Sequence, residues 1–473
     1  MSHRNTAAKL PAHILIFPLP SQGHVNSMLH LAELLSLSGL HVTMVLSEYT
    51  HGRLLRHGNL HSRFSRYSRF RIATLADGLP ADHPRVGERI MDIVLSLKEV
   101  GGSLFRKLME STDALSDGGT RRRVSCLIMD RVLSFALPVV EEMGIPYVYF
   151  RTISACSFWT YFCIQEIIDA GEVPLKAYQE WKDLSGDATF CRVDDINDTG
   201  FQTIKTETKR TTTAKALILN TFEDLEGPIL DRIRKHIPNL YSIGPLHAHL
   251  KARLELKGIE SSNHSSSFWE EDRSCMAWLD SQPENSVLYV NFGSVTLLTK
   301  DELLEFWYGL VNSGQRFLWV IRPDSIVEND GNEVPIELDE GTKARGYMLE
   351  WVPQREVLAH RAIGVFFTHS GWNSTLESIC IGIPMLCWAY FADQTTNSRF
   401  ISEVWKMGFD IKDTCDRILI ERMVREIMEV RRNEFLERAR FMATMAKKTI
   451  SEGGDSHSNL DRLIEFLKST IIS

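Results

Sequence analysis

The sequence lacks both a membrane-spanning stretch and an excess of basic residues. A helix that crosses a bilayer needs about 20 consecutive apolar residues, and no run in this chain approaches that length. Lysine and arginine total 53 against 61 aspartate and glutamate residues, which gives a formal net charge of −8. Nucleic acids and anionic membrane surfaces attract basic proteins, so this balance excludes both as principal partners. Any anionic ligand must therefore be held by local groups.

Cysteine pairs and processing signals are also missing. None of the eight cysteines stands in a CxxC pair or at a metal-finger spacing, so we expect reduced thiols and no metal site. The apolar run His13 to Pro20 is too short and too close to the N-terminus for a secretory signal. From these absences we predict a cytoplasmic protein, and we expect a monomer.

Motifs of two common enzyme classes are absent as well. The chain has no GxGxxG loop after a strand and no Walker loop, which argues against an oxidoreductase with a nucleotide cofactor. It also has no GxSxG elbow, so a hydrolase would lack its nucleophile.

The order of apolar segments predicts two α/β domains. Strand-like and helix-like segments alternate from the start, as in HILIFPLP, VNSMLHLAELLSLSG and HVTMVLSE, and a second series begins with SVLYVNFGS and ELLEFWYGLVNSG. This alternation is typical of parallel sheets with crossover helices, and 473 residues suffice for two such domains. We expect one domain over residues 1–247, an exposed polar linker over 248–268, a second domain over 269–452 and a C-terminal helix within 453–473.

One segment of the second domain is predicted to bind phosphate. An apolar strand, Gly364 to Phe367, leads into the turn Thr368 to Gly371, and a helix follows over Trp372 to Cys380. The first N–H groups of a helix have no intrahelical partner and lie at the positive end of its dipole, so they attract anions. Asn373 and Ser374 add side-chain donors at this place.

Residues on either side of this turn match the remaining parts of a nucleotide sugar. Trp351 offers a flat face for a base, and Gln354 and Glu377 have groups that hydrogen-bond ribose hydroxyls. Asp393 and Gln394 are suited to neighbouring sugar hydroxyls. Each residue alone is more often a packing or solvated residue, but their combination around one strand, turn and helix predicts a donor site for a nucleotide sugar.

Residues 351–394 closely resemble the signature box of the plant family 1 UDP-glycosyltransferases of secondary metabolism. The resemblance implies the GT-B fold, with two Rossmann-like domains facing a central cleft and a C-terminal helix that packs back on the first domain. It also implies a UDP-sugar co-substrate, with UDP-glucose favoured by Gln394, and no metal. Ser370 stands where the family usually has Cys, and Ala389 stands where Pro is usual, which leaves the loop before Asp393 freer.

The resemblance assigns further contacts. It places Thr152 at the 6-hydroxyl of the sugar, Ser294 at the phosphates and Ala392 on the acceptor side. The implied donor site comprises Thr152, Ser294, Trp351, Val352, Gln354, His369, Gly371, Trp372, Asn373, Ser374, Glu377, Asp393 and Gln394.

His24 and Asp130 are the candidate catalytic pair. His24 follows the first strand and precedes a helix, and Asp130 ends the strand VSCLIMD, so both lie at the edge where open α/β sheets bind ligands. The positive end of the helix disfavours a charged imidazole, which suits a general base. A carboxylate fixes the tautomer of such a base and stabilises the imidazolium that forms. Asp130 matches the family position for this helper.

The predicted reaction is an inverting transfer of glucose from UDP-glucose to a hydroxyl group. The segments PSQGHVNS, ADGLP, FRTISACSFW and FISEVWKMG are most similar to the subgroup that acts on iridoids and other terpenoids, including 7-deoxyloganetic acid. We therefore expect a small, largely apolar plant metabolite near His24, Arg151 and Ala392. If the acceptor is an acid, Arg151 or Arg131 is expected to meet its carboxylate. A flavonoid or other phenolic acceptor stays open, and so does a non-catalytic nucleotide-sugar-binding protein.

Overall fold

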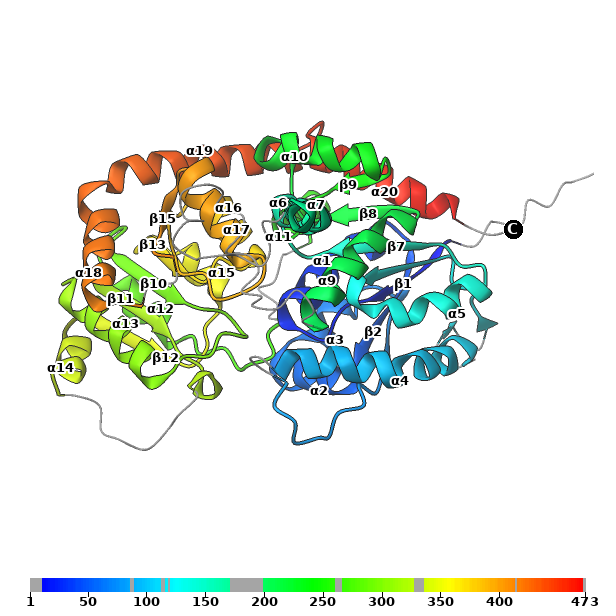
Figure 1. Cartoon of the computed structure of the whole chain (residues 1–473), viewed down its shortest axis with the longest axis horizontal. Coiled ribbons are helices and arrows are strands. Elements are labelled where there is room, and N and C mark those ends of the chain that lie inside the picture. The colour runs from blue at the N-terminus through cyan, green and yellow to red at the C-terminus, as the bar shows by residue number, and fades with distance from the viewer. Residues whose placement is uncertain are drawn as a thin grey trace, which may run out of the picture.

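A computed structural model describes residues 11–85, 89–111, 115–117, 120–170, 199–259, 266–326, 336–412 and 415–470. Two α/β units lie side by side, each built around a parallel sheet with helices on both faces (Figure 1). This arrangement confirms the predicted α/β class with two doubly wound sheets.

The first sheet has seven strands in the order β3-β2-β1-β6-β7-β8-β9, and all neighbouring pairs are parallel. Its strands are β1 (His13–Phe17), β2 (His41–Ser47), β3 (Phe70–Leu75), β6 (Cys126–Asp130), β7 (Tyr147–Arg151), β8 (Ala216–Leu219) and β9 (Leu240–Ser242). A separate antiparallel ladder joins β4 (Ser116–Asp117) to β5 (Thr120–Arg121). The helices of this unit are α1 (Gln22–Leu37), α2 (Glu48–His57), α3 (Leu60–Phe64), α4 (Ile90–Glu110), η2 (Arg131–Ala136), α5 (Leu137–Glu142), α6 (Ala155–Phe162), α7 (Ile164–Asp169), α9 (Thr199–Lys209), η4 (Arg210–Thr213), α10 (Glu223–His236) and α11 (Leu246–Leu256).

The second sheet has six parallel strands in the order β12-β11-β10-β13-β14-β15. Its strands are β10 (Val287–Asn291), β11 (Arg316–Val320), β12 (Gly346–Leu349), β13 (Ile363–Thr368), β14 (Met385–Cys387) and β15 (Gly408–Asp410). The helices that follow the first unit are α12 (Ser274–Asp280), α13 (Lys300–Asn312), η5 (Pro323–Ser325), α14 (Ile336–Arg345), α15 (Gln354–Leu358), α16 (Trp372–Ile381), α17 (Gln394–Arg399), η6 (Phe400–Val404), α18 (Arg417–Arg425), η7 (Glu426–Val430), α19 (Arg432–Ile450) and α20 (Asp455–Ser469).

Each sheet reverses its strand order at one place. In the first sheet the chain runs from β1 to β2 and β3 and then returns to β6 on the other side of β1. In the second it runs from β10 to β11 and β12 and returns to β13 on the other side of β10. Loops diverge at such a reversal and leave a crevice at the carboxyl ends of the strands. The loop after β1 leads into α1, whose first turn carries His24, and η2 begins with Arg131 directly after β6. The loops after β10 and β13 carry Ser294 and His369.

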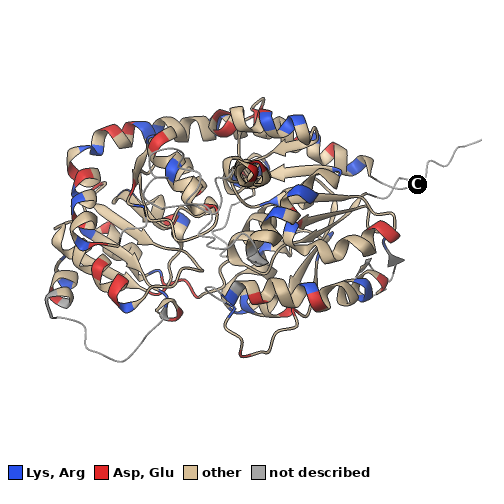
Figure 2. Cartoon of the chain, in the orientation of Figure 1, with Lys and Arg blue, Asp and Glu red and all other residues tan. Residues whose placement is uncertain are grey.

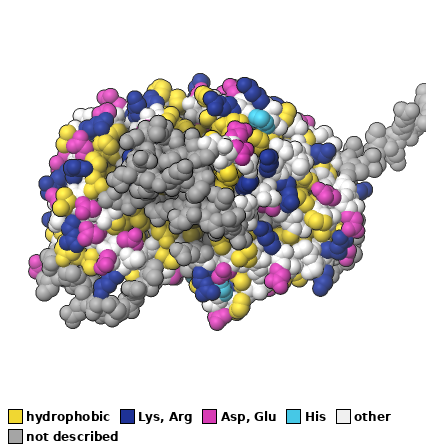
Figure 3. Space-filling model, in the orientation of Figure 1, with side chains coloured by type: hydrophobic (Ala, Val, Ile, Leu, Met, Phe, Trp, Pro, Cys, Tyr) yellow, Lys and Arg dark blue, Asp and Glu magenta, His cyan; other side chains and the backbone are white. Residues whose placement is uncertain are grey.

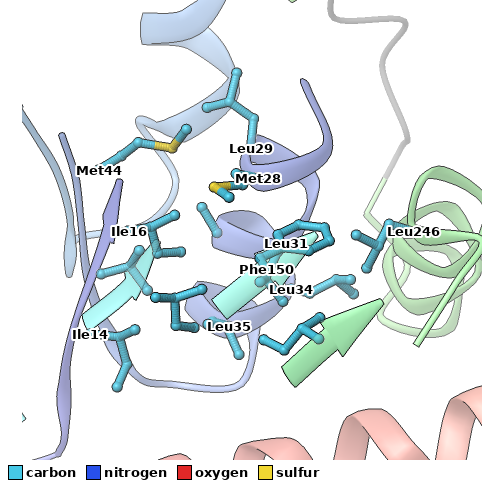
Figure 4. Close-up of a cluster of buried hydrophobic side chains, with 14 of the residues drawn as sticks. Ile14, Ile16, Met28, Leu29, Leu31, Leu34, Leu35, Met44, Phe150 and Leu246 are labelled. Atoms are coloured by element: carbon cyan, nitrogen blue, oxygen red, sulfur yellow. The ribbon is translucent and has the colours of Figure 1, made fainter. Parts of the chain in front are cut away.

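Helix α1 shows how the first core forms. Its residues Met28, Leu31 and Leu35 are fully buried against β1, β2 and β7 (Figure 4). Burying each such side chain contributes roughly 1.5–3 kcal/mol relative to exposure. The apolar spacing predicts this helix, and its first turn carries the candidate base, His24.

Residues 248–268 differ from the predicted exposed linker. Helix α11 occupies the start of this segment, and Leu246, Leu250 and Leu254 are buried in the core of the first unit. The segment is polar in composition, but these three leucines stand four residues apart, which places them on one face of the helix. Residues 260–265 lie outside the described residues.

The C-terminal helices connect the two units. α19 runs along the second unit and α20 continues over the first (Figure 1). Leu460, Leu463 and Leu467 of α20 are buried in the core of the first unit, and the hydroxyl of Ser456 donates to the carbonyl of Gly244 at 2.5 Å. The end of the chain therefore packs on the sheet with which the chain begins.

Charged side chains of both signs are interspersed along the outer helices (Figure 2). Both signs also appear across the described part of the surface in this view (Figure 3). Within the described ranges, no helix combines the length and apolar character needed to cross a membrane.

Candidate active site

A cavity lies between the carboxyl ends of the two sheets and is lined by both units. It collects residues that are spread over most of the sequence. The predicted site residues that line it are His24, Thr152, Ser294, Trp351, Val352, Gln354, His369, Gly371, Trp372, Asn373, Ser374, Glu377 and Asp393. Asp130, Arg151, Ala392 and Gln394 lie outside the lining.

His24 and Asp130 form a hydrogen-bonded pair at the wall of the cavity. His24 lies in the first turn of α1, and its Nδ1 bonds the carboxylate of Asp130 at the end of β6. The parallel register of β1 with β6 brings the two strand ends together. Burial alone would raise the pKa of Asp130, but the charge and hydrogen bond of His24, with smaller contributions from nearby arginines, lower it. A carboxylate on Nδ1 leaves Nε2 as the atom that accepts a proton.

Thr152 touches the same imidazole. Its hydroxyl lies 3.0 Å from His24 Nδ1, and the residue also lines the cavity. The resemblance assigns Thr152 to the sugar, but in this structure its hydroxyl contacts the candidate base. Thr152 therefore helps to fix the ring plane of His24.

The turn before α16 is shaped for an anion. The helix starts after Gly371 with no side-chain cap, and its first intrahelical bond runs from Thr375 N to Gly371 O at 2.9 Å. The N–H groups before Thr375 are therefore free of helical partners, at the positive end of the dipole.

His369 stands beside this turn and depends on a neighbouring glycine. A Cβ on Gly293, whose φ is +81°, would come within 2.5 Å of the His369 ring. Burial lowers the pKa of His369 to about 4. The ring is therefore neutral at pH 7, and the residue lines the cavity beside the turn.

Gln354 organises the predicted ribose site. Its amide nitrogen donates to Ser374 Oγ at 3.0 Å and to Glu377 Oε2 at 2.8 Å, and its Oε1 accepts from Asn291 Nδ2 at 2.9 Å. The amide nitrogen and the amide oxygen of Gln354 are thereby both hydrogen-bonded within the protein. Gln354 thus positions Glu377 and Ser374, and Glu377 is the residue that is left to meet a ribose hydroxyl. Burial raises the pKa of Glu377.

Trp351 is supported from behind by a second tryptophan. The rings of Trp269 and Trp351 lie 4.8 Å apart, and the guanidinium groups of Arg53 and Arg322 lie 5.1 and 5.4 Å from the Trp269 ring. Trp269 packs against cores of both units. This tilted contact fixes the ring of Trp351, whose role as the face for a base stays a prediction, and Trp269 is a residue that the sequence reasoning missed.

Asn397 and Gln394 fix the turn that is predicted to meet the sugar. Asn397 Nδ2 donates to Asp393 Oδ2 at 2.9 Å. Burial raises the pKa of Asp393 to about 6. Gln394 is buried, and its Oε1 accepts from the backbone N–H groups of Tyr390 and Phe391 at 2.9 and 3.0 Å. These bonds close the loop that Ala389 was expected to leave freer, and they engage the side-chain carbonyl of Gln394 within the protein, so a contact of its amide nitrogen with the sugar stays a prediction. Ala392 adopts a φ of +56° in the same turn.

Polar contacts across the cavity join the two units. Asn373 Nδ2 donates to Gly23 O and Asn373 Oδ1 accepts from Ser27 Oγ, both at 2.8 Å. Trp372 is buried and its indole N–H donates to the carbonyl of Asn220 at 2.8 Å, so it anchors the box to the first unit. The partners are separated by 346, 350 and 152 positions. No local signal in the sequence marks them.

Arg131 and Arg151 lie behind the catalytic pair. Arg131 follows Asp130 directly, and Arg151 directly precedes Thr152. Both side chains are buried. An acidic acceptor contact at Arg151 stays a prediction.

Comparison with known proteins places this site in a family. The profile of the UDP-glucuronosyl and UDP-glucosyl transferases matches residues 120–416, more than half of the chain. A 7-deoxyloganetic acid glucosyl transferase from Catharanthus roseus is 59% identical over 98% of both chains. A myricetin 3-O-rhamnoside 1,2-glucosyltransferase from Crocosmia x crocosmiiflora is 41% identical over 97% of this chain and 96% of its own. The crystal structure of Os79 from O. sativa with UDP matches the fold with a TM-score of 0.79 at 24% identity, over 96% of this chain and 100% of that one. The chain therefore belongs to the UDP-glucuronosyl and UDP-glucosyl transferase family and is a UDP-glycosyltransferase.

Proposed function

We propose that this enzyme transfers glucose from UDP-glucose, with inversion, to a hydroxyl group of a small, largely apolar plant metabolite of the iridoid type. The observation that carries the proposal is the hydrogen-bonded pair His24–Asp130 in one wall of a cavity whose other wall is the uncapped start of α16. The 59% identical relative that is named for 7-deoxyloganetic acid makes this compound the first acceptor to test.

The chemistry follows from where the base points. The acceptor hydroxyl gives its proton to His24 Nε2 while its oxygen forms a bond to the anomeric carbon of glucose. The bond from that carbon to the UDP oxygen breaks, and UDP leaves with the electron pair. Attack from the face opposite the leaving group inverts the anomeric centre. Asp130 stabilises the imidazolium that forms.

The departing diphosphate acquires charge next to prepared donors. These are the free N–H groups before Thr375, the neutral ring of His369 and the hydroxyl of Ser374. Donors that are fixed before the reaction stabilise developing charge without reorganising. These protein groups therefore stabilise the negative charge of the leaving UDP, and we expect transfer to need no added metal.

The test is an acceptor panel with UDP-glucose, read by mass spectrometry, with NMR of the product for the anomeric configuration. We expect a β-glucoside of 7-deoxyloganetic acid and undiminished product in a strong chelator. Retention of configuration would contradict the base role of His24. Activity that chelator abolishes and magnesium or manganese restores would contradict the metal-free stabilisation.

A phenolic acceptor is the second candidate. The 41% identical relative is named for a flavonoid glycoside, so a flavonol and its 3-O-rhamnoside belong in the panel. A protein that only binds nucleotide sugars would release no UDP with any acceptor. The buried carboxylate of Asp130 beside His24 favours an enzyme over a protein that only binds nucleotide sugars, since binding a UDP-sugar needs no general base.

A further inference from the structure

Two buried arginines are neighbours in the chain of residues that contact the candidate base. Asp130 and Arg131 are consecutive, as are Arg151 and Thr152, and the strands that end here, β6 and β7, are neighbours in the sheet. Asp130 and Thr152 each contact His24. Arg131 and Arg151 are 9% and 3% exposed. The charges of both arginines act on the Asp130 carboxylate, so two cations lie near the candidate base.

Arg151 has no direct polar partner among the described residues, although the charges of Asp130 and Asp393 act on it. It makes no hydrogen bond and no ion pair with any residue in the described ranges, and its Nη1 is buried without a partner. Its contacts of note are with the rings of Phe158 and Tyr161, whose centres lie 5.1 and 6.0 Å from the guanidinium carbon. Burial, and then the charge of Arg131, lower the pKa of Arg151 to about 9, so it is still charged at pH 7. A buried charge is costly unless it is paired.

The nearby carboxylates already have other partners. Asp130 is bonded to His24, and Asp393 accepts from Asn397. Glu207, which acts electrostatically on Arg131, accepts from Ser134 Oγ at 2.8 Å. Arg131 donates to the carbonyl of Ile204 at 3.2 Å and lies 5.9 Å from the Tyr161 ring. Neither arginine therefore has a carboxylate of the protein as its own hydrogen-bond partner among the described residues.

Another buried arginine of the same unit shows what a structural guanidinium looks like. Arg63 is as buried as Arg151, but its Nε donates to Glu33 at 2.6 Å, inside a cluster that also holds Tyr67. At Arg63 the fold supplies a carboxylate that hydrogen-bonds the guanidinium, although Nη1 of Arg63 is also buried without a partner. At Arg151 no carboxylate of the described residues makes such a hydrogen bond, and Asp130 and Asp393 act on it only through their charge.

We propose that Arg151, with Arg131 beside it, binds a carboxylate of the acceptor and makes the enzyme selective for hydroxylated carboxylic acids over their neutral esters. This inference rests on the proposed glucosyl transfer and specifies the acceptor class of that site. A guanidinium fork matches a carboxylate with two parallel N–H donors, which orients the acceptor as well as holding it. The anchored acid then presents its hydroxyl to His24 Nε2.

The test compares one hydroxy acid with its methyl ester, for which 7-deoxyloganetic acid and its ester are suitable. For the wild-type enzyme we expect kcat/KM to favour the acid by about 10- to 100-fold, the range for a hydrogen bond to a charged group. Arg151→Met should lower kcat/KM for the acid far more than for the ester, mainly through a higher KM for the acid, so that the acid-to-ester ratio falls toward 1. Arg151→Lys should keep part of the preference because it keeps the charge.

Thermal unfolding separates a binding role from a structural one. Arg151→Met removes an unpaired buried charge, so Tm should be unchanged or higher. Arg63→Met is the matched control, and its Tm should fall because Glu33 loses its partner. An acid-to-ester ratio that Arg151→Met leaves unchanged would overturn the inference, and so would equal losses for both acceptors together with a lower Tm. If the wild-type enzyme glucosylates the acid and the ester equally well, the inference is wrong and the proposed function stands. If it glucosylates neither of them nor any other acceptor, both are wrong.

Discussion

The two walls of the cleft are built in opposite ways. The donor wall comes mainly from one continuous segment, in which Gln354 bonds Ser374 and Glu377 only 20 and 23 positions away. The base wall is assembled from the ends of three strands, and His24 meets Asp130 and Thr152 over 106 and 128 positions. A continuous motif can be recognised in a sequence by its pattern. The base wall is harder to recognise, because its residues come together only through the register of the whole first sheet.

Removing the base should have the largest effect. His24→Ala should lower kcat by about 10²- to 10⁴-fold, the usual contribution of a general base. Asp130→Asn should also lower kcat, because the amide does not stabilise an imidazolium. Initial rates at saturating acceptor measure both losses, and circular dichroism checks the fold. A near-wild-type rate in either folded variant would contradict the role of the base wall.

The sugar end of the donor wall should discriminate by a smaller factor. Asp393 and the free amide nitrogen of Gln394 are expected to meet the equatorial 3- and 4-hydroxyls of glucose. UDP-galactose has an axial 4-hydroxyl and would leave one partner unpaired, which costs about 1–3 kcal/mol or roughly 10- to 100-fold in rate. Competition between the two donors measures the ratio. Equal use of UDP-galactose would show that this end of the cavity does not read the 4-hydroxyl.

The same carboxylate should give the donor wall a pH dependence. The pKa of Asp393 is about 6, raised from 3.8 by burial. Above pH 6 it is ionised and accepts two hydroxyl protons, so kcat/KM for UDP-glucose should fall as the pH drops through about 6. Asp393→Asn should have a lower kcat/KM that does not change as the pH passes through about 6. The pH profile of kcat/KM for UDP-glucose measures both effects.

The stability of the Asp393 variant provides a second readout. The folded protein keeps this proton up to about pH 6, whereas the unfolded chain loses it near 3.8. The ionised side chain therefore destabilises the fold as the pH rises through that window. At pH 7, Asp393→Asn should unfold at a higher temperature than the wild type. A lower Tm at pH 7 would contradict the raised pKa.

Contacts between the walls should have the smallest effect. Ser27→Ala removes the donor to Asn373 Oδ1 and should raise KM for UDP-glucose by about 2- to 10-fold, the value of one neutral hydrogen bond. Ser36→Ala is the control in the same helix. Its hydroxyl donates to Ala32 O at 2.7 Å, just as Ser27 Oγ donates to Gly23 O at 3.0 Å, but within the described residues it makes no bond to the second unit. Equal changes in the two variants would mean that the Ser27 contact is only structural.

The sequence suffices to predict the fold and the residues of the proposed donor wall, but not the hydrogen-bond partners of individual side chains. Alternating apolar segments suffice for two parallel sheets, since their period is visible within a few residues. The roles of Gln354 and Trp372 could not be predicted from the sequence. Residue type does not reveal that the Gln354 amide donates to Glu377, or that the Trp372 indole N–H donates to the carbonyl of Asn220. Helix α11 was missed because three leucines among charged residues resemble a linker in composition. The unpaired state of Arg151 follows only from the packed structure.

The central claim is that one wall binds the donor and the other performs the reaction. Calorimetric titration of UDP into His24→Ala and Glu377→Ala tests this separation most directly. The account predicts that His24→Ala binds UDP with the wild-type dissociation constant although it no longer transfers glucose, whereas Glu377→Ala binds UDP more weakly. A loss of UDP affinity in His24→Ala that parallels its loss of turnover would contradict the account.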